Sequence, residues 1–395
     1  MRHPRIAEPQ RPLNMALTLT YEERSPYTSL GLFAGAGGLD LGFESAGFIH
    51  TEANEILHYA TATLKHNRPN WHVAHSDVRT YTPSFRKDLD VLLAGFPCQG
   101  FSLGGKRDPN DERNTLYREV LRIAKLMKPR AIVMENVLNL RTMVHPETGQ
   151  PFAEQIKAEL KAIGYHTQWA YFKVSGYGVP QTRRRFVFVA FRGKHNAHFE
   201  FPRPGRTTAS GPFLNDLVSG SNAPLPNHEP IWGFESQVHT TLGGRVDTHD
   251  PIIPIRISRT ASDGNPLRSY EEPFPAMDTA TVWGSAQGKG RAERVVKDRS
   301  TEKFIRNPKS KATLWRITAK HMRTFTAREY ARLQTFPDAW EFMGSNKREF
   351  QLQIGNAVPV SFARTIALSV RRALEMEDGL NSRIALPNRE LTFAM

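Results

Sequence analysis

Residues 28–46 read TSLGLFAGAGGLDLGFESA. The apolar run at 28–33 predicts a short buried strand, and residues 39–46 predict a helix. The glycine-rich turn between them, at 34–38, lets the backbone approach a ligand, and the N-terminus of the helix favours negative charge. This order of elements is typical of nucleotide-type sites. The dinucleotide fingerprint G-x-G-x-x-G is not met, because Asp40 stands where its third glycine would be.

Acidic residues follow the next two predicted strands. The strand at 48–53 ends at Asn54-Glu55, and Glu55 lies about twenty residues past the turn, where α/β nucleotide sites place an acid that binds ribose. An exposed acid at a strand end is an equally open interpretation. A weaker strand at 73–76 ends at Asp77. We expect Asp77 at the same edge of the sheet, in reach of an adenine amino group.

The only cysteine of the 395 residues, Cys98, lies in the loop GFPCQGFS at 95–102. The loop follows an apolar run at 89–94 that predicts a buried strand. Pro97 fixes φ just before the cysteine, so a thiol on this stiffened loop can face a ligand at the carboxyl end of the sheet. A small buried hydrophobic residue is the commoner role of a free cysteine, and both interpretations stay open at this point.

Strands and helices continue to alternate up to residue 192. Further strands are predicted at 130–134, which ends at Glu135, and at 165–174 and 186–191; helices are predicted at 115–127 and 152–163. This alternation predicts an α/β fold with a Rossmann-like, doubly wound, mostly parallel sheet. Residues 201–320 lack a clear helical pattern and predict a smaller lobe of strands and loops. Helical periodicity returns at 326–336 and 361–374.

Composition and charge indicate a polyanionic partner. The chain is 39% hydrophobic and carries a formal net charge of +14. Between Lys289 and Arg323 there are twelve Lys or Arg residues against three acidic ones, which is typical of a surface that binds phosphates. A single cysteine excludes an intramolecular disulfide, and no His/Cys/Asp cluster has metal-site spacing. No apolar run is long enough to span a membrane.

The ordered motifs resemble those of the DNA cytosine-5 methyltransferases that use S-adenosylmethionine, of the stand-alone bacterial restriction-modification type. In chain order these motifs are FAGAGG (33–38), NE (54–55), Asp77, PCQ (97–99), ENV (135–137), QTRRR (181–185), RExxRLQxFP (328–337) and QIGNAVP (353–359). The resemblance covers roughly residues 28–195 and 321–375. Arg184 makes the QxRxR motif unusually basic, and we assign it to phosphate contact.

The resemblance implies a role for each catalytic residue. Cys98 would add to C6 of cytosine, because a thiolate is strongly nucleophilic and also leaves well. Arg183 is the candidate cation that favours the thiolate. Glu135 would protonate or hydrogen-bond N3, and Arg185 would hold O2 and orient Glu135. The base must leave the duplex stack, and residues 101–113 are the predicted mobile lid over it.

The resemblance also implies cofactor contacts and a domain plan. S-adenosylmethionine, without a metal, would be held by Phe33, Gly35, Gly37, Gly38, Glu55, Ile56, Asp77, Val78, Gly95, Pro97, Leu116, Asn356 and Val358. The expected divisions are a flexible arm (1–27), a catalytic domain (28–197 and 347–378), a target-recognition domain (198–320), a hinge or closing motif (321–346) and a C-terminal tail (379–395). We expect a monomer that acts on double-stranded DNA in the bacterial cytoplasm, at the nucleoid, with a cognate restriction endonuclease as functional partner and no membrane contact.

Three other functions remain to be weighed. A nicotinamide dehydrogenase is disfavoured by the failed fingerprint and leaves Pro97-Cys98-Gln99 unexplained. An RNA (tRNA) cytosine-5 methyltransferase would use the same scaffold, although the large segment 198–320 favours sequence-specific reading of a duplex. A non-catalytic DNA-binding protein would have no need of Cys98, Glu135 and Arg185 together.

Overall fold

The computed structural model describes residues 17–84, 88–97, 111–193, 198–210 and 325–380. Between 210 and 325 it describes residues 212–214, 217, 225–229, 273–274 and 276, and the backbone of five strands. Residues 98–110, which include Cys98 and residues 101–110 of the predicted lid, lie outside the described residues.

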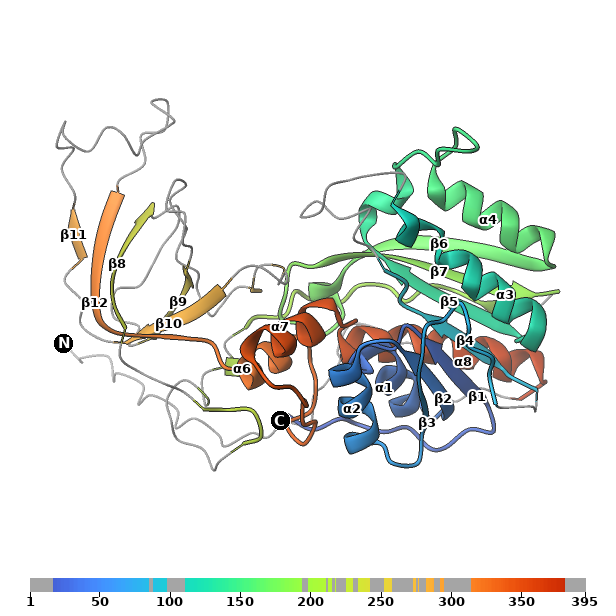
Figure 1. The fold of residues 1–395 in the computed structure, drawn as a ribbon, viewed down its shortest axis with the longest axis horizontal. Coiled ribbons are helices and arrows are strands. Elements are labelled where there is room, and N and C mark those ends of the chain that lie inside the picture. Colours follow the sequence, from blue (N-terminus) through green and yellow to red (C-terminus); the bar gives the residue numbers. More distant parts are fainter. Residues whose placement is uncertain are drawn as a thin grey trace, which may run out of the picture.

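A seven-stranded sheet forms the larger part of the molecule, in the strand order β3-β2-β1-β4-β5-β7-β6 (Figure 1). Neighbours from β3 to β5 run parallel, whereas β7 pairs antiparallel with both β5 and β6. The strands are β1 Thr28–Leu32, β2 Ile49–Glu55, β3 His72–His75, β4 Val91–Ala94, β5 Ala131–Asn136, β6 Tyr165–Lys173 and β7 Arg184–Arg192. This topology confirms the predicted doubly wound, mostly parallel α/β fold.

Helices cover both faces of this sheet. The described helices, of which α6 and α7 lie beside the sheet, are α1 Gly38–Ser45, α2 His58–Asn67, α3 Tyr117–Met127, α4 Phe152–Ala162, α6 Ala327–Leu333, α7 Lys347–Asn356 and α8 Val360–Glu377, with short 3-10 turns η1 Glu112–Thr115, η2 Leu138–Arg141 and η3 Val174–Gly176. The helical periodicity at 326–336 and 361–374 corresponds to α6 and α8. The sequence did not predict α7, because Ile354 is the only large apolar side chain among its buried residues.

Alternate residues of the central strands enter two different cores. On β4, Val91 and Leu93 pack in the core that α1 and α8 cover, while Leu92 and Ala94 pack in the core that α3 and α4 cover. Because both faces are buried, such strands appear in the sequence as continuous apolar runs. Polar side chains that follow the parallel strands lie together at the carboxyl edge of the sheet, because these strands all end at that edge.

A second sheet of five strands comes from the segment predicted to recognise the target. Its order is β11-β12-β10-β9, with β8 also paired to β12, and every pair is antiparallel. The strands are β8 Phe234–Thr241, β9 Ile252–Ile257, β10 Val282–Gln287, β11 Ala292–Arg294 and β12 Leu314–Thr324. The predicted domain boundary at residue 320 falls inside β12. In Figure 1, α6 and α7 lie between the two sheets.

Residues 17–27 lie against the catalytic domain. The amide of Leu17 donates to Oδ2 of Asp338 (2.8 Å), and Arg371 donates to the carbonyl oxygen of Glu23 (2.7 Å). The Tyr27 side chain is buried in the core beneath α1 and α8. The prediction of a flexible arm is therefore wrong for residues 17–27, because local composition does not reveal these contacts with α8 and the segment after α6; residues 1–16 lie outside the described part.

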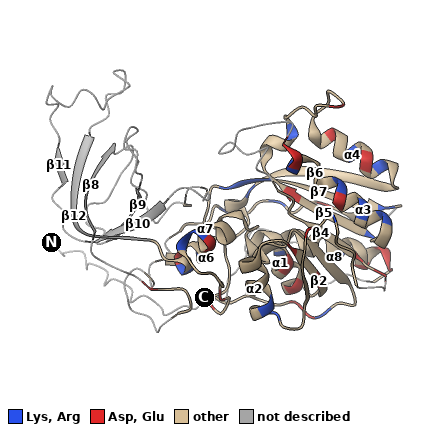
Figure 2. Ribbon diagram, in the orientation of Figure 1, with Lys and Arg blue, Asp and Glu red and all other residues tan. Residues whose placement is uncertain are grey.

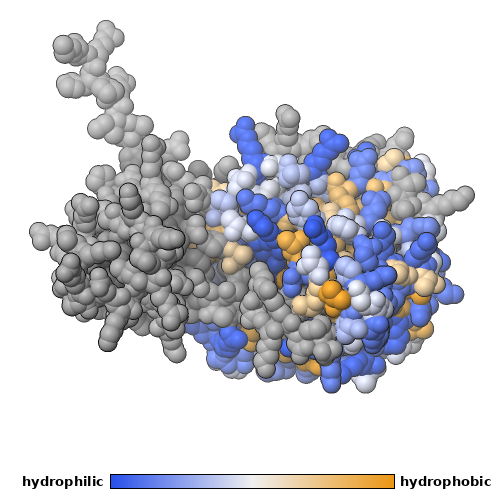
Figure 3. All heavy atoms as spheres, turned by 90° about the horizontal axis from the view of Figure 1, so that it is seen from above, coloured by the Kyte–Doolittle hydropathy of each residue, from blue (hydrophilic) through white to orange (hydrophobic). Residues whose placement is uncertain are grey.

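Figure 2 marks the positions of the basic and acidic residues along the described ribbon, among them several on α3 and α4. On the face shown in Figure 3, the described residues are largely hydrophilic, with hydrophobic residues scattered among them. Within the described residues, no helix has the length and apolar character required to cross a membrane.

Candidate active site

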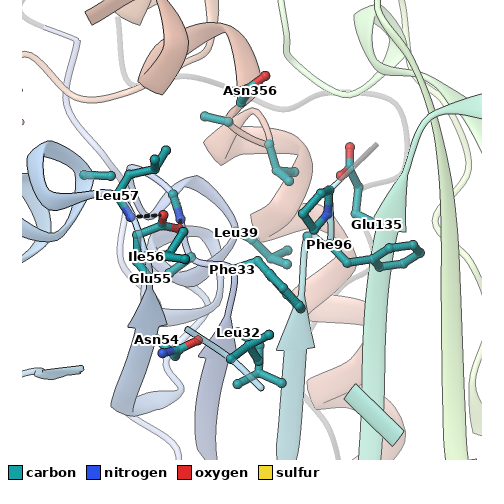
Figure 4. A pocket seen from close by; sticks show the side chains of 18 of the residues that line it. Leu32, Phe33, Leu39, Asn54, Glu55, Ile56, Leu57, Phe96, Glu135 and Asn356 are labelled. Atoms are coloured by element: carbon teal, nitrogen blue, oxygen red, sulfur yellow. Dashed lines mark hydrogen bonds between the residues drawn. The ribbon is translucent and has the colours of Figure 1, made fainter. Parts of the chain in front are cut away.

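A cavity of about 440 Å³ opens at the carboxyl ends of β1, β2, β4 and β5. Glu55 stands on one side of it and Glu135 on the other, with Phe33 and Leu39 between them and Asn356 above (Figure 4). Its volume lies within the roughly 300–1,000 Å³ typical of small-molecule sites. The position follows from the topology, because the carboxyl ends of parallel strands meet at one edge of the sheet.

The cavity brings together most of the residues that the sequence singled out. Every predicted cofactor residue except Gly37 and Gly38 lines it, and so do Glu135, Arg183 and Arg185. Gly95 and Pro97 bring the chain to the cavity wall immediately before Cys98. The site predicted from motifs in separate parts of the chain is thus one continuous space among the described residues.

Gly37 and Gly38 have a packing role. A Cβ on Gly37 would lie 2.7 Å from Cδ2 of Leu64, and one on Gly38 would lie 2.1 Å from the carbonyl oxygen of Val358. Gly37 also has a φ of 84°, which favours glycine. Neither residue lines the cavity, but together they let the start of α1 pack against α2 and against Val358, which does.

Glu55 is fixed by backbone hydrogen bonds. Its Oε2 accepts from the amide of Gly35 (2.7 Å) and its Oε1 from the amide of Leu57 (2.8 Å, dashed in Figure 4). Burial raises the pKa of this carboxyl group, and the amide donors oppose the shift. Each carboxylate oxygen has a second lone pair, so Glu55 can accept further hydrogen bonds from a ligand.

Asp77 is engaged by a neighbouring arginine. Arg79 contacts its Oδ2 through Nη2 at 2.6 Å and its Oδ1 through the backbone amide at 2.9 Å. The side-chain hydrogen bond from Arg79 lowers the pKa of Asp77. Both residues line the cavity. A ligand amino group at Asp77 would therefore share the carboxylate with Arg79.

The opposite wall carries a partly buried ion pair. Nε of Arg185, at the start of β7, lies 2.5 Å from Oε1 of Glu135, at the end of β5. No donor in the described residues is aligned for a hydrogen bond with that oxygen, so the contact is an ion pair. Next to it, Nδ2 of Asn136 donates to the carbonyl oxygen of Phe96 (3.1 Å) and ties the end of β5 to the loop that leads to Cys98.

Arg183 has a structural role that its motif did not predict. It is 2% exposed, and its guanidinium donates to the carbonyl oxygens of Gly355 (2.7 Å) and Asn356 (3.5 Å). Unsatisfied carbonyl groups at the end of α7 are the natural partners of an arginine. Since Asn356 lines the cavity, Arg183 fixes the wall on which two predicted cofactor residues lie.

Two buried glutamines were noted in the sequence only as letters of motifs. Nε2 of Gln181 donates to the carbonyl oxygen of Leu333 (2.7 Å) and to Oε1 of Gln334 (3.0 Å). Nε2 of Gln334 in turn donates to the carbonyl oxygen of Ile354 (2.7 Å). These bonds join three motifs that lie far apart in the chain. Their presence in the motifs could have marked both glutamines as candidate functional residues, but no local sequence pattern predicts that they pair with each other.

The segment predicted to recognise the target contacts the same region. The amide of Thr182 donates to the carbonyl oxygen of Phe274 (2.7 Å), and the amide of Phe274 donates to that of Pro180 (2.8 Å). The phenyl ring of Phe274 packs 5.6 Å from that of Phe325, between ring centroids. Phe274, from the segment 198–320, is thus hydrogen-bonded to the backbone immediately before Arg183.

The chain matches the family described as C-5 cytosine-specific DNA methylase over residues 27–372. It is 34% identical to the Type II methyltransferase M.Eco47II of Escherichia coli over 362 residues, which cover 90% of this chain and 81% of the relative. It is 31% identical to M.NgoMIV of Neisseria gonorrhoeae, over 89% of this chain and 99% of that protein.

Two solved structures share the fold. One is a DNMT2 mutant of Spodoptera frugiperda, with a TM-score of 0.54, 19% identity, and coverage of 88% of this chain and 100% of that one. The other is the methyltransferase EhMeth of Entamoeba histolytica, with a TM-score of 0.53, 13% identity, and coverage of 90% and 99%. Together with the family match over nearly the whole chain, the relatives and the geometry of the cavity establish that this protein belongs to the C-5 cytosine-specific DNA methylases and is a DNA cytosine-5 methyltransferase.

Proposed function

We propose that the protein transfers a methyl group from S-adenosylmethionine to C5 of a cytosine that it flips out of a specific duplex DNA sequence. The observation that carries the proposal is the cavity itself. It has the buried acceptor Glu55 on one side, the Glu135–Arg185 pair on the other, and Pro97, the neighbour of Cys98, in its wall.

The residues of the cavity fit S-adenosylmethionine. Glu55 offers free lone pairs to the ribose hydroxyl groups, and Asp77 and Val78 would lie beside the adenine. Phe33, Ile56 and Leu116 supply apolar surface for the rings. The bound cofactor would provide an electrophilic methyl group on a sulfonium centre.

The remaining chemistry belongs to the chain. We assign to the Cys98 thiolate the addition to C6, which turns C4, C5 and C6 into an enamine and makes C5 nucleophilic. Addition puts negative charge on the ring, and Glu135 would hold a proton at N3 while Arg185 keeps its carboxyl group in place. Once C5 carries the methyl group, a base removes the C5 proton, the electron pair of that C–H bond forms the C5–C6 double bond, and the electron pair of the C6–S bond returns to the thiolate.

A duplex with 5-fluorocytosine at the target tests this assignment. Fluorine cannot leave as a proton, so the wild-type enzyme should be trapped after one methyl transfer as a complex that resists denaturant. Cys98→Ser should form no such complex, because a hydroxyl group is far less ionised than a thiol at neutral pH. An adduct in Cys98→Ser, or full turnover on the fluorinated duplex, would refute the covalent route. Transfer to tRNA in preference to duplex DNA would refute the choice of substrate.

The names of the relatives suggest the biological setting. M.Eco47II and M.NgoMIV are named Type II methyltransferases, and we propose that this chain likewise protects bacterial DNA in the cytoplasm from a cognate restriction endonuclease. Bisulfite sequencing of DNA from cells that express the protein would give the target sequence. Resistance of that DNA to an endonuclease of the same specificity would test the protective role, and sedimentation would test the expected monomer.

A further inference from the structure

A buried acidic residue with no role in the proposed chemistry lines the cavity. Asp40, in the first turn of α1, is 1% exposed, and it is one of the residues that line the cavity. Its side chain lies over β1 at Gly31, where a Cβ would be only 1.8 Å from Oδ1 of Asp40. The carboxyl group therefore occupies a space that exists because residue 31 has no side chain.

A histidine and a serine stand behind this carboxyl group. Nε2 of His50, on β2, is 3.4 Å from Oδ1 of Asp40, and Nδ1 of His50 is 3.0 Å from Oγ of Ser29. The ring of Trp71 packs against the imidazole at 4.2 Å between centroids. In the described part of the chain, Oδ1 of Asp40 and Nε2 of His50 have no hydrogen-bond partner. The two unsatisfied atoms thus face each other across a short gap.

The protonation of this cluster is sensitive to charge in the cavity. Burial, and secondarily the negative charge of Glu55, raises the pKa of Asp40 to about 7, whereas burial lowers the pKa of His50 to about 3. His50 is therefore neutral, and Asp40 changes its charge near neutral pH. A cation in the cavity favours the ionised carboxyl group, because opposite charges attract more strongly in a partly desolvated space than in water.

Among the described residues, the titratable groups placed beside Asp40 are His50 and Glu55, both on β2, and β1 contributes the neutral Ser29. α8 packs against α1 with apolar residues that include Ala363 and Phe362. The guanidinium of Arg364 on α8 binds instead to Glu22.

We propose that Asp40 is a specificity-determining residue of the cofactor cavity, which favours the cationic S-adenosylmethionine over its uncharged-sulfur product S-adenosylhomocysteine. Methyl transfer removes the charge of the sulfonium, so the attraction to Asp40 is present before the reaction and absent after it. This inference rests on the proposed function, since it takes S-adenosylmethionine as the methyl donor.

The first consequence is a release of protons on binding. A ligand that prefers the ionised carboxyl group lowers the pKa of Asp40, so near pH 7 the binding of S-adenosylmethionine expels part of a proton. The binding of S-adenosylhomocysteine should release a smaller fraction of a proton. Titration calorimetry of the full chain in two buffers with different ionisation enthalpies measures both proton numbers directly.

The second consequence is a pH-dependent preference between the two ligands. Between about pH 6 and about pH 8, the affinity ratio of S-adenosylmethionine to S-adenosylhomocysteine should rise about three- to tenfold in the wild type, because only the ionised carboxyl group attracts the sulfonium; this is the scale of one screened charge pair in a partly solvated site. In Asp40→Asn this rise should disappear. The variant also corrects for the ammonium group of the ligands, which titrates with either protein.

Glu52→Gln is the matched control. Like Asp40, Glu52 is a buried acid, but it lies on β2, accepts hydrogen bonds from Ser84 and does not line the cavity. This variant should therefore keep the rise of the affinity ratio with pH that the wild type shows. Equal proton numbers and a constant affinity ratio in the wild type would overturn the inference and leave the proposed function intact. Failure of both ligands to bind would overturn the proposed function itself. If Asp40→Asn does not fold, the proton numbers of the wild type still decide.

Discussion

Nη1 of Arg183 donates a hydrogen bond to the carbonyl oxygen of Gly355, 172 residues further along the chain, at a distance of 2.7 Å. The bond joins the segment before β7 to the end of α7, and thereby one wall of the cavity to the other. The sequence assigned Arg183 to the activation of Cys98, which lies outside the described residues, so that role stays a prediction. The contact with Gly355 adds a structural role that a motif cannot reveal.

Replacement of Arg183 should affect both stability and cofactor binding. In Arg183→Met, the carbonyl groups of Gly355 and Asn356 lose a buried donor, which should cost about 2–4 kcal/mol of unfolding free energy. Cofactor affinity should also fall, because Asn356 and Val358 lose their support. Urea unfolding and calorimetry measure the two effects. Arg184→Met is the control: its side chain is exposed, and it should leave stability within about 0.5 kcal/mol while weakening DNA binding.

Loss of the Glu55 carboxylate should weaken S-adenosylmethionine binding by roughly 1.5–3 kcal/mol, the scale for hydrogen bonds to a charged group. Glu55→Ala also leaves the amides of Gly35 and Leu57 without their acceptor, so thermal stability should fall as well. Glu55→Gln keeps one acceptor oxygen and should lose less on both measures. Unchanged affinity of Glu55→Ala in calorimetry would show that the ribose does not lie at this residue.

The ion pair between Arg332 and Asp338 should be a major support of the region between the two sheets. Its Nη2–Oδ2 distance is 2.7 Å, and the two side chains are 2% and 6% exposed. Asp338→Ala leaves a buried guanidinium without its carboxylate and removes the acceptor of the Leu17 amide, so it should cost about 3–5 kcal/mol. Denaturant unfolding measures this cost. Glu119→Ala breaks the more exposed pair with Arg122 and should cost at most about 1 kcal/mol; equal losses in the two variants would contradict the prediction.

Asp40 should make the stability of the protein depend on pH. Its pKa is raised in the folded state from 3.8 to about 7, so its contribution to stability is complete below about pH 4 and is lost as the pH rises through about 7. Asp40→Asn should therefore gain stability relative to the wild type over this interval, by a few kcal/mol at about 1.4 kcal/mol per pKa unit. His50 has the opposite effect on the pH dependence of stability. Because its pKa is lowered in the folded state, its contribution to stability is lost as the pH falls from 6.5 towards about 3. Thermal unfolding of the wild type and of Asp40→Asn between about pH 4 and about pH 7 checks the prediction. A difference in stability between the two proteins that does not change with pH would contradict it.

The basic segment 289–323 should supply contacts to phosphate. Neutralisation of Lys309 and Lys311 together should weaken binding to all DNA sequences alike and reduce the slope of log affinity against log salt concentration. Titrations with specific and unrelated duplexes at several salt concentrations measure both effects. A loss confined to the specific duplex would instead identify this segment, most of which lies outside the described residues, as a reader of bases.

The sequence by itself determined the sheet and the place of the site. The apolar runs at 28–33 and 89–94 are buried on both faces, so they mark strands without any knowledge of their partners. Glu55 and Glu135 lie at the ends of β2 and β5, and Asp77 follows β3; because parallel strands end at one edge, their convergence on one cavity could be predicted. These are consequences of local chain geometry.

Only the tertiary structure decided what stabilises and tunes that cavity. Residues 17–27 and α7 carry no strong apolar periodicity, because backbone and polar contacts hold much of both in place. The bonds of Arg183 to Gly355 and of Gln181 to Gln334 cross more than a hundred residues, and His50 meets Asp40 only where Gly31 leaves room for the carboxyl group. A pairing of this kind depends on which surfaces meet when the helices pack onto the sheet. That information is spread over the whole core and is not present in any single stretch of sequence.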